Sequence, residues 1–527
     1  MKTLLVLLLT LVAGTSANAQ KQHPLRKLQL AEMAISQLYV DSVNQQKLVE
    51  DAIRGMLKEL DPHSSYSTAK ETKALNEPLN GSFDGIGIQF NMVEDTLLVI
   101  QPVSKGPSEK VGILAGDRII TVADTTISGV KMERSEIMRR LRGPRGSKIK
   151  LGIKRRGVNE LLYFTVTRGK IPVYSVDAYY MIRPHLGYIR IGSFGATTYG
   201  EFMKAVDSLQ TDGMRDLIID LQDNGGGYLQ ASVKIIEEFL QKNDLIVYTE
   251  GRAQRRMEYR APGNGRFTKG KVYVLVNEYT ASAAEILSGA MQDQDRGTII
   301  GRRSFGKGLV QQQLGFPDGS MIRLTIARYY TPSGRCIQKP FVAGDNKDYE
   351  EDILARYQHG EFFSQDSIKH HGPAYHTSIG RTVYGGGGIT PDIFIPEDTL
   401  GMTSYYKAAA MTGLILQFAY TYTDNNRLKL NNFHEMMDMV KYLDTQNLVD
   451  KFATYADKNG LKRRNLMIRK SYNLLNRYLN SRVIYNMLDE QALTQYLNLD
   501  DPTVTTALQV FKNKAAFPKK PIKKNKK

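Results

Sequence analysis

A serine and a lysine, Ser282 and Lys307, stand 25 positions apart in surroundings that would let them act as nucleophile and base. A serine hydroxyl attacks a carbonyl efficiently only when a neighbouring base takes its proton, and a buried, neutral lysine can be that base. Alone, Ser282 would suit an ordinary helix N-cap and Lys307 a solvated loop charge. Together with a nearby glycine-rich loop, the pair indicates covalent hydrolysis.

Ser282 falls between a predicted buried strand over residues 271–276 and a predicted helix over residues 283–291. At such a turn the first N–H groups of the helix have no backbone partner, and the helix dipole presents its positive end. Both effects would stabilise the negative oxygen that forms when a carbonyl is attacked. The serine is therefore placed where a nucleophile for acyl transfer is expected.

The glycine-rich loop contains three consecutive glycines at 225–227, between an apolar strand at 217–219 and a helical pattern over 231–240. Glycines let backbone amides approach a ligand closely and point their N–H groups inward. A phosphate-binding loop would continue with Gly-Lys-Ser or Gly-Lys-Thr, whereas Tyr228 and Leu229 follow here. The loop therefore favours an oxyanion hole over a nucleotide site.

The sequence resembles the C-terminal processing (tail-specific) serine peptidases over residues 30–400. The resemblance rests on the motifs Thr-Ala-Ser-Ala-Ala-Glu around Ser282 and Gly-Lys-Gly around Lys307, with Gln311 four residues after the lysine. It implies that Ser282 is the nucleophile, that Lys307 is the general base, and that Gln311 orients the lysine.

The family's Asn-Pro-Gly-Gly stretch appears here as Asn224 followed by the three glycines at 225–227, so that glycine replaces proline. By this resemblance, the oxyanion would be bound by the backbone N–H groups of Gly226 and Ala283. The substitution leaves the choice of the loop donor open by one position.

Residues 81–169 alternate short apolar runs with turn residues, which predicts a small barrel-like sandwich with one flanking helix. The expected strands are 86–90, 97–103, 118–122, 149–154 and 163–167, and the expected helix is 133–141.

The stretch Gly85-Ile86-Gly87-Ile88 resembles the carboxylate-binding loop of a PDZ domain, and the turn at 114–119 resembles a characteristic PDZ turn. PDZ domains add a peptide as an extra strand and bind its terminal carboxylate with loop amides. Ile88, Ile137 and Leu141 would line the side-chain pocket. The expected partners are proteins or peptides with free, apolar carboxyl termini.

From residue 187 onward strands and helices alternate, which predicts βαβ units around a largely parallel sheet with the site at its strand ends. The further strands expected are 188–191, 245–248, 309–314 and 321–329, with a helix over 199–209. After about residue 400 the pattern becomes helical, for example over 405–422. That region would be a packing platform or the surface of a homo-oligomer.

The net charge of +17 is uneven, because eight lysines lie in the last sixteen residues. Without them about +9 is spread over five hundred residues, a modest excess that does not indicate a nucleic-acid partner. The tail should be disordered and could contact anionic lipids or the cell wall, or simply be solvated.

The chain begins with Lys2, an apolar segment at 4–12 and Ala17-Asn18-Ala19, which together predict a secretory signal peptide. We therefore expect export, most simply to the periplasm. Cys336 is the only cysteine, so no intrachain disulfide can form, and we interpret it as structural.

The predicted fold class is α/β multidomain. Its parts are a signal peptide (1–19), an N-terminal helical region (20–80), a PDZ domain (81–169), a peptidase core (170–400) with a polar surface insertion (340–385), a C-terminal helical region (401–510) and a basic tail (511–527).

The favoured function is an exported serine endopeptidase that cleaves proteins near their carboxyl termini and needs no metal or nucleotide cofactor. One alternative is a non-catalytic PDZ scaffold. Another is a hydrolase that pairs a serine with a histidine of the insertion: His359, His370, His371 or His376. A metal site there is disfavoured because no His-Glu-x-x-His spacing occurs.

Overall fold

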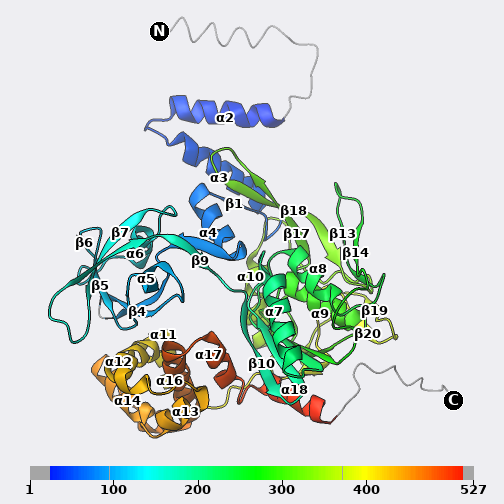
Figure 1. The fold of residues 1–527 in the computed structure, drawn as a ribbon. Helices are drawn as coiled ribbons and strands as arrows, with labels where there is room; N and C mark the ends of the chain where they lie inside the picture. Colours follow the sequence, from blue (N-terminus) through cyan, green and yellow to red (C-terminus); the bar gives the residue numbers. More distant parts are fainter. Residues whose placement is uncertain (1–23, 94, 371, 514–527) are drawn as a thin grey trace, which may run out of the picture. The chain divides into compact units, whose positions relative to one another are not determined.

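The computed structural model describes residues 24–93, 95–370 and 372–513 (Figure 1). The predicted signal peptide, His371 and nearly all of the predicted basic tail lie outside these ranges. Among the described residues, none of the helices has the length and apolar character needed to cross a membrane. The described residues form two compact units: one contains residues 24–70, 311–325 and 341–348, and the other contains the remaining described residues.

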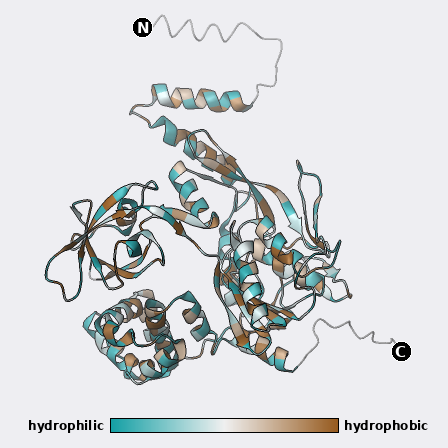
Figure 2. Cartoon of the chain, viewed as in Figure 1, coloured by the Kyte–Doolittle hydropathy of each residue, from teal (hydrophilic) through white to brown (hydrophobic). Residues whose placement is uncertain are grey.

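The first unit begins with two helices, α2 (Pro24–Leu38) and α3 (Gln45–Lys58). Polar and apolar residues mix along α2 (Figure 2). None of its residues is buried. The α3 helix begins where the Asn44 side chain accepts a hydrogen bond from the Lys47 amide at 3.0 Å. The helical N-terminal region predicted from the sequence is confirmed.

A tight turn follows α3 and is fixed by the carboxylate of Asp61. It accepts hydrogen bonds from the amides of His63 (2.9 Å) and Ser64 (3.0 Å) and from the Ser64 hydroxyl (2.6 Å). The chain then forms β1 (Ser65–Ser67), which pairs antiparallel with the first residues of β18 (Met321–Tyr330). The hydrogen bonds give this turn an architectural role.

The predicted PDZ domain is an antiparallel sheet in the order β3-β4-β5-β7-β8. Its strands are β3 (Ile88–Val93), β4 (Thr96–Pro102), β5 (Arg118–Val122), β7 (Lys148–Lys154) and β8 (Leu162–Thr167). The helix α6 (Arg134–Leu141) accompanies them. The predicted sandwich with one flanking helix is therefore confirmed. A pairing that the sequence did not indicate joins β2 (Ser82–Gly85) to β9 (Gly169–Pro172) at the domain's entry and exit.

The predicted peptidase core is built on a sheet in the order β10-β11-β12-β15-β16-β21. Its strands are β10 (Val176–Arg183), β11 (Leu186–Ile191), β12 (Asp216–Asp220), β15 (Val272–Val276), β16 (Thr298–Gly301) and β21 (Ile393–Phe394). From β11 to β21 the neighbours are parallel, and β10 is an antiparallel edge. The predicted parallel sheet is confirmed.

The expected strand at 245–248 forms, but not in the parallel sheet. It is β13 (Leu245–Glu250), which pairs antiparallel with β14 (Met257–Arg260) and with the last residues of β18. The connection from β13 to β14 is only a few residues long, and a parallel neighbour would need a crossover of about a dozen residues or more. The short connection therefore forces an antiparallel pair.

Apolar residues cover both faces of the parallel sheet. One face packs against α7 (Thr198–Thr211), α8 (Leu229–Glu237) and α9 (Ala283–Asp293). On the other face, Val504 and Ala507 of α18 (Pro502–Lys512) pack with sheet residues such as Tyr188. The last helix of the predicted C-terminal region thus belongs to the peptidase core.

The C-terminal region is a helical bundle with its own apolar core. Its helices are α11 (Ser404–Met411), α12 (Leu414–Leu430), α13 (Met436–Asp444), α14 (Leu448–Lys458), α15 (Asn465–Lys470), α16 (Tyr472–Met487) and α17 (Glu490–Leu497). The single helix expected over 405–422 is interrupted at Gly413, whose φ of 72° is in the left-handed region.

Candidate active site

Ser282 lies at the turn between β15 and α9, as predicted, with a half-buried side chain. Its backbone has φ 57° and ψ −116°, a conformation that residues with a side chain rarely adopt. Such strain persists only when surrounding contacts hold it, and it is commonly found at functional sites. The strand, the turn and the helix together present Ser282 at the carboxyl end of a parallel strand.

The glycine-rich loop after β12 lies directly against this turn. The amide of Ala281 donates to the carbonyl of Asn224 at 2.9 Å. Gly226 has φ 97°, and a Cβ at this position would lie 2.8 Å from the Cβ of Ser282 and 2.9 Å from the amide nitrogen of Ala283. Only glycine allows the loop to approach the serine this closely.

The two predicted oxyanion donors differ in their present hydrogen bonding. The N–H of Gly226 donates to Oδ1 of the buried Asn224 at 2.8 Å, and Asn224 in turn donates to the carbonyl of Ile191 at 2.7 Å. Ala283 is the first residue of α9, where a helix leaves its N–H groups without intrahelical partners. Both residues adjoin Ser282, and their role as oxyanion donors stays a prediction.

A buried carboxylate connects the serine turn to the lysine loop. Glu285 Oε2 accepts hydrogen bonds from the amides of Ser282 (2.9 Å) and Lys307 (2.8 Å). Its Oε1 accepts from the Ser304 hydroxyl (2.5 Å) and the Gly306 amide (2.7 Å). The structure therefore brings the backbones of the predicted nucleophile and base together on one side chain.

Burial raises the pKa of Glu285 to about 7, against the opposing effect of its four hydrogen-bond donors. Sequence reasoning missed this residue, although it lies within the Thr-Ala-Ser-Ala-Ala-Glu motif. An acidic residue in the first turn of a helix is usually read as a simple cap, which conceals the second set of partners that the fold supplies.

The buried Tyr329 connects the same two segments from another side. Its hydroxyl oxygen lies 2.6 Å from the carbonyl oxygen of Lys307 and 3.2 Å from that of Ser282. A phenol has one proton to donate, so the Tyr329 hydroxyl donates mainly to the nearer carbonyl, that of Lys307. The side chains of Ser282 and Lys307 are both half-buried, as a dyad that must meet substrate requires.

A buried ion network holds the segment that precedes Lys307. Glu361 accepts hydrogen bonds from Arg303 (2.7 Å) and Arg356 (2.9 Å), and all three side chains are buried. Arg356 also donates to the carbonyls of Arg303 (2.6 Å) and Ser304 (3.1 Å). Arg356 and Glu361 come from the segment predicted to be a polar surface insertion. That description is wrong for them, because their charges neutralise one another inside the protein.

Gln311 belongs to the first unit, whereas Ser282 and Lys307 belong to the second. Its Nε2 donates to the Thr325 hydroxyl at 3.3 Å, and Thr325 donates to Asp61 at 3.0 Å. Its predicted role in orienting Lys307 stays a prediction.

The surroundings of Cys336 and of one insertion histidine, His370, are also defined. Burial raises the pKa of the Cys336 thiol, which disfavours the reactive thiolate. The His370 ring stacks on Tyr384 with centroids 3.7 Å apart. Over residues 24–93, 95–370 and 372–513, no three histidine, cysteine or acidic side chains gather in a metal-binding arrangement.

The predicted PDZ loop borders a groove of about 290 Å³. Gly85, Ile86, Gly87, Ile88 and Leu141 line it, as expected. Ile137 does not, because it is fully buried in the domain core. Met138 and Arg134 of α6 line the groove instead.

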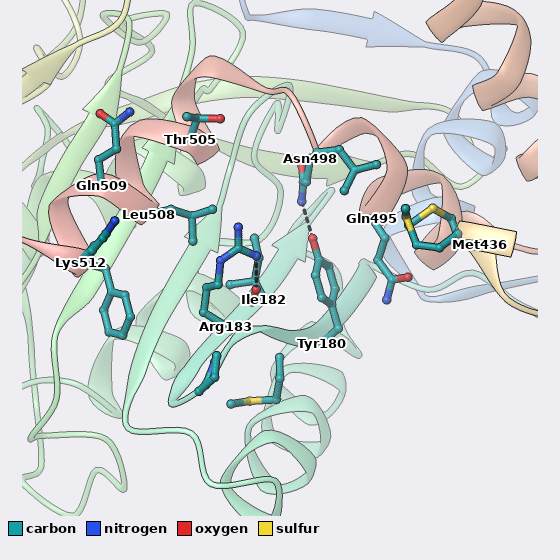
Figure 3. Close-up of a pocket in the computed structure, with 15 residues that line it drawn as sticks. Tyr180, Ile182, Arg183, Met436, Gln495, Asn498, Thr505, Leu508, Gln509 and Lys512 are labelled. Atoms are coloured by element: carbon teal, nitrogen blue, oxygen red, sulfur yellow. Dashed lines mark hydrogen bonds between the residues drawn. The ribbon is translucent and has the colours of Figure 1, made fainter. Parts of the chain in front are cut away.

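A second, larger pocket of about 890 Å³ is lined by residues of β10, α13, α17 and α18 (Figure 3). Asn498 donates to the Tyr180 hydroxyl at 2.8 Å, and Arg183 donates to the Ile182 carbonyl at 2.8 Å. Neither Ser282 nor Lys307 lines this pocket, so its size does not identify it as the catalytic site.

Several segments of the chain match known families. Residues 185–348 match peptidase family S41, residues 85–167 match the PDZ domain, and residues 10–72 match the N-terminal domain of the activating protease CtpB. Residues 405–489 match a family of unknown function.

Curated relatives are similar to more than half of the chain. The carboxy-terminal-processing protease of Bartonella bacilliformis is 39% identical over 305 residues, which are 57% of this chain and 69% of that protein. The carboxy-terminal processing protease CtpB of Bacillus subtilis is 33% identical over 347 residues, 64% of this chain and 71% of that protein. A solved photosystem II D1 C-terminal processing protease is 27% identical, covers 71% of this chain and 87% of its own, and has a TM-score of 0.37.

Proposed function

The chain belongs to the carboxy-terminal processing proteases of peptidase family S41, and from this we propose that Ser282 and Lys307 form the catalytic dyad of an exported endopeptidase. Membership in the family makes it a serine peptidase with a PDZ domain. The observation that carries the dyad is the carboxylate of Glu285, which accepts hydrogen bonds from the amides of both residues.

The reaction would proceed through an acyl-enzyme. Ser282 Oγ attacks the carbonyl carbon of the scissile peptide bond while Lys307 Nζ accepts the hydroxyl proton. The amide of Ala283 stabilises the oxyanion, joined by Gly226 once its N–H turns from Asn224 toward the substrate. Lys307 then returns the proton to the leaving amine. Water releases the acyl group by the same steps, with Lys307 accepting the proton of the water.

The PDZ groove would select the substrates. The Gly85–Ile88 loop offers backbone amides for a terminal carboxylate, and the apolar lining favours an apolar terminal side chain. Substrates are then proteins with free, apolar carboxyl termini. Gln311 would orient Lys307, as the resemblance to the family implies.

The proposed location rests on sequence motifs near the two ends of the chain. The apolar segment and small-residue site at the N-terminus support export to the periplasm. The lysine-rich C-terminus supports peripheral contact with an anionic membrane or the cell wall. The C-terminal helical region would be the surface through which the chain self-associates.

The test is cleavage of an unfolded protein that ends in an apolar residue. Ser282→Ala and Lys307→Ala should each lower kcat by about a thousandfold or more, and the double variant should resemble either single variant. Ser404→Ala, an exposed serine on α11, is the matched control and should keep full activity. Full activity of Lys307→Ala would refute the dyad. Full activity of Ser282→Ala would point to another nucleophile, and an inactive parent protein that still binds tails would favour the scaffold alternative.

A further inference from the structure

The C-terminal helical region is fixed to the PDZ domain by an ion pair. Arg118 of β5 contacts Asp424 of α12 at 2.6 Å, and the carboxylate side chain is 9% exposed. Arg156 donates to the backbone carbonyl of the same Asp424 at 2.9 Å. Two arginines of the PDZ domain therefore hold one residue of the bundle.

A second contact fixes the end of α16. The Gln101 side chain of β4 donates to the carbonyl of Leu488 at 2.8 Å, immediately after α16 ends at Met487. A carbonyl at the end of a helix has no intrahelical donor, so this hydrogen bond supplies its partner. It sets the position of the last turn of α16 on the PDZ sheet.

That last turn brings Tyr485 to the groove of the PDZ domain. Tyr485 is one of the groove-lining residues, together with the Gly85–Ile88 loop, Phe90 and Met138. Its side chain is half-buried, and burial raises the pKa of its hydroxyl. The groove that the loop begins is therefore completed by a side chain from a different region of the chain.

We infer that Tyr485 is a specificity-determining residue of the tail-binding groove, and that the C-terminal bundle serves to hold it there. The inference rests on the proposed function, in which this groove binds the carboxyl terminus of a substrate. An aromatic wall adds apolar contact for a terminal side chain that reaches it and limits the space for a bulky one. The inference gives a role to a segment, residues 405–489, that matches a family of unknown function.

Tail binding measures this role directly. Fluorescent peptides ending in Val or Phe, and an amidated Val peptide, are titrated against the full chain carrying Ser282→Ala. Tyr485→Ala should weaken binding of the Val peptide by about fivefold. It should leave binding of the Phe peptide unchanged, because the lost ring leaves space that the Phe side chain fills. Tyr485→Phe keeps the ring and should bind like the parent. Tyr472→Ala, on the same helix with 45% exposure, is the matched control and should change nothing.

The anchoring is tested separately. Asp424→Asn and Arg118→Gln each break the ion pair from one side, so both should lower the Val-to-Phe preference as Tyr485→Ala does. Arg118 is 34% exposed on its strand, which makes its variant the safer one for folding. Asp438→Asn breaks the exposed pair with Lys441 in the same bundle and should leave the preference unchanged. A Val-to-Phe preference equal to that of the parent in both Asp424→Asn and Arg118→Gln would overturn the anchoring.

The outcomes separate this inference from the proposed function. A parent protein that binds free and amidated Val tails equally would overturn tail recognition and this inference with it. A parent that prefers the free tail, combined with an unchanged Val-to-Phe preference in Tyr485→Ala, would overturn only the role of Tyr485. A fivefold loss that is confined to the Val tail would support it.

Discussion

The amides of Ser282 and Lys307 donate to the same oxygen, Oε2 of Glu285, at 2.9 and 2.8 Å. Ser282 is the cap that precedes helix α9, and Lys307 lies in the loop before β17 (Leu309–Gly315), so a single buried atom sets the spacing of two separate segments. The hydroxyl of Tyr329, next to both carbonyls, joins them again. The site is thus positioned through its backbone before any substrate arrives.

Replacing Glu285 with Gln should therefore lower activity without changing either proposed catalytic side chain. The amide side chain has one acceptor oxygen and a donor nitrogen, so it cannot accept from all four donors that the carboxylate serves. Each lost charge-assisted hydrogen bond is worth about 1.5–3 kcal/mol, so kcat should fall by about tenfold or more. Peptide cleavage is measured well below the unfolding temperature of each protein.

Glu351→Gln, an exposed acid on α10 (Lys347–Gln358), is the control and should behave like the parent. Unchanged kcat in Glu285→Gln would show that the shared carboxylate does not position the site.

Glu285 also predicts how stability depends on pH. Its pKa is raised from 4.5 to about 7 in the folded protein, so the folded state binds the proton more tightly than the unfolded state. The stabilising contribution is complete below pH 4.5 and is lost as pH rises through about 7, by about 3 kcal/mol in the free energy of unfolding. Denaturant unfolding at several pH values should show this decline in the parent and not in Glu285→Gln. Parallel curves for the two proteins would contradict it.

The two neighbouring glycines of the loop offer a matched pair of substitutions. A Cβ at Gly226 would lie 2.7 Å from the Ala281 carbonyl oxygen and would have to tolerate φ 97°, whereas a Cβ at Gly225 meets nothing within 4 Å. Gly226→Ala should therefore displace the turn that carries Ser282 and lower kcat by about a hundredfold or more. Gly225→Ala should retain most activity. Equal activity of the two variants would show that the close approach of the loop is unimportant.

The fold could be predicted well where apolar runs and turn residues agree. The strand, turn and helix around Ser282 follow from a buried run, a small residue and an Ala-rich segment, each of which is a local signal. The antiparallel pairing of β13 could not be predicted in the same way, because strand pairing depends on the length of the following connection as well as on the apolar pattern.

The supporting residues of the site were harder to predict. Arg356 and Glu361 look like surface charges in a polar segment, and only the fold shows that they form an ion pair in the interior, where Glu361 also pairs with Arg303. Ile137 was expected in the groove, yet Arg134, Met138 and Leu141 share the groove face of α6. Their spacing of four and three residues places them on one helical face, and Ile137, at the edge of that face, is buried in the domain core.

The remaining prediction concerns the free carboxyl terminus of the substrate. Loop amides near Gly85 and Gly87 suit an anion, and an amidated terminus offers them a neutral acceptor instead. The loss of charge-assisted hydrogen bonding should cost about 1.5–3 kcal/mol, which corresponds to roughly a ten- to hundredfold lower kcat/KM.

One unfolded protein is prepared with a free Val terminus, an amidated Val terminus and a free Asp terminus. The Asp terminus should also be cleaved slowly, because its side chain would place a charge against Ile88 and Leu141. Equal rates on all three substrates would refute recognition by the PDZ groove and leave the Ser282–Lys307 dyad to be judged by its own variants.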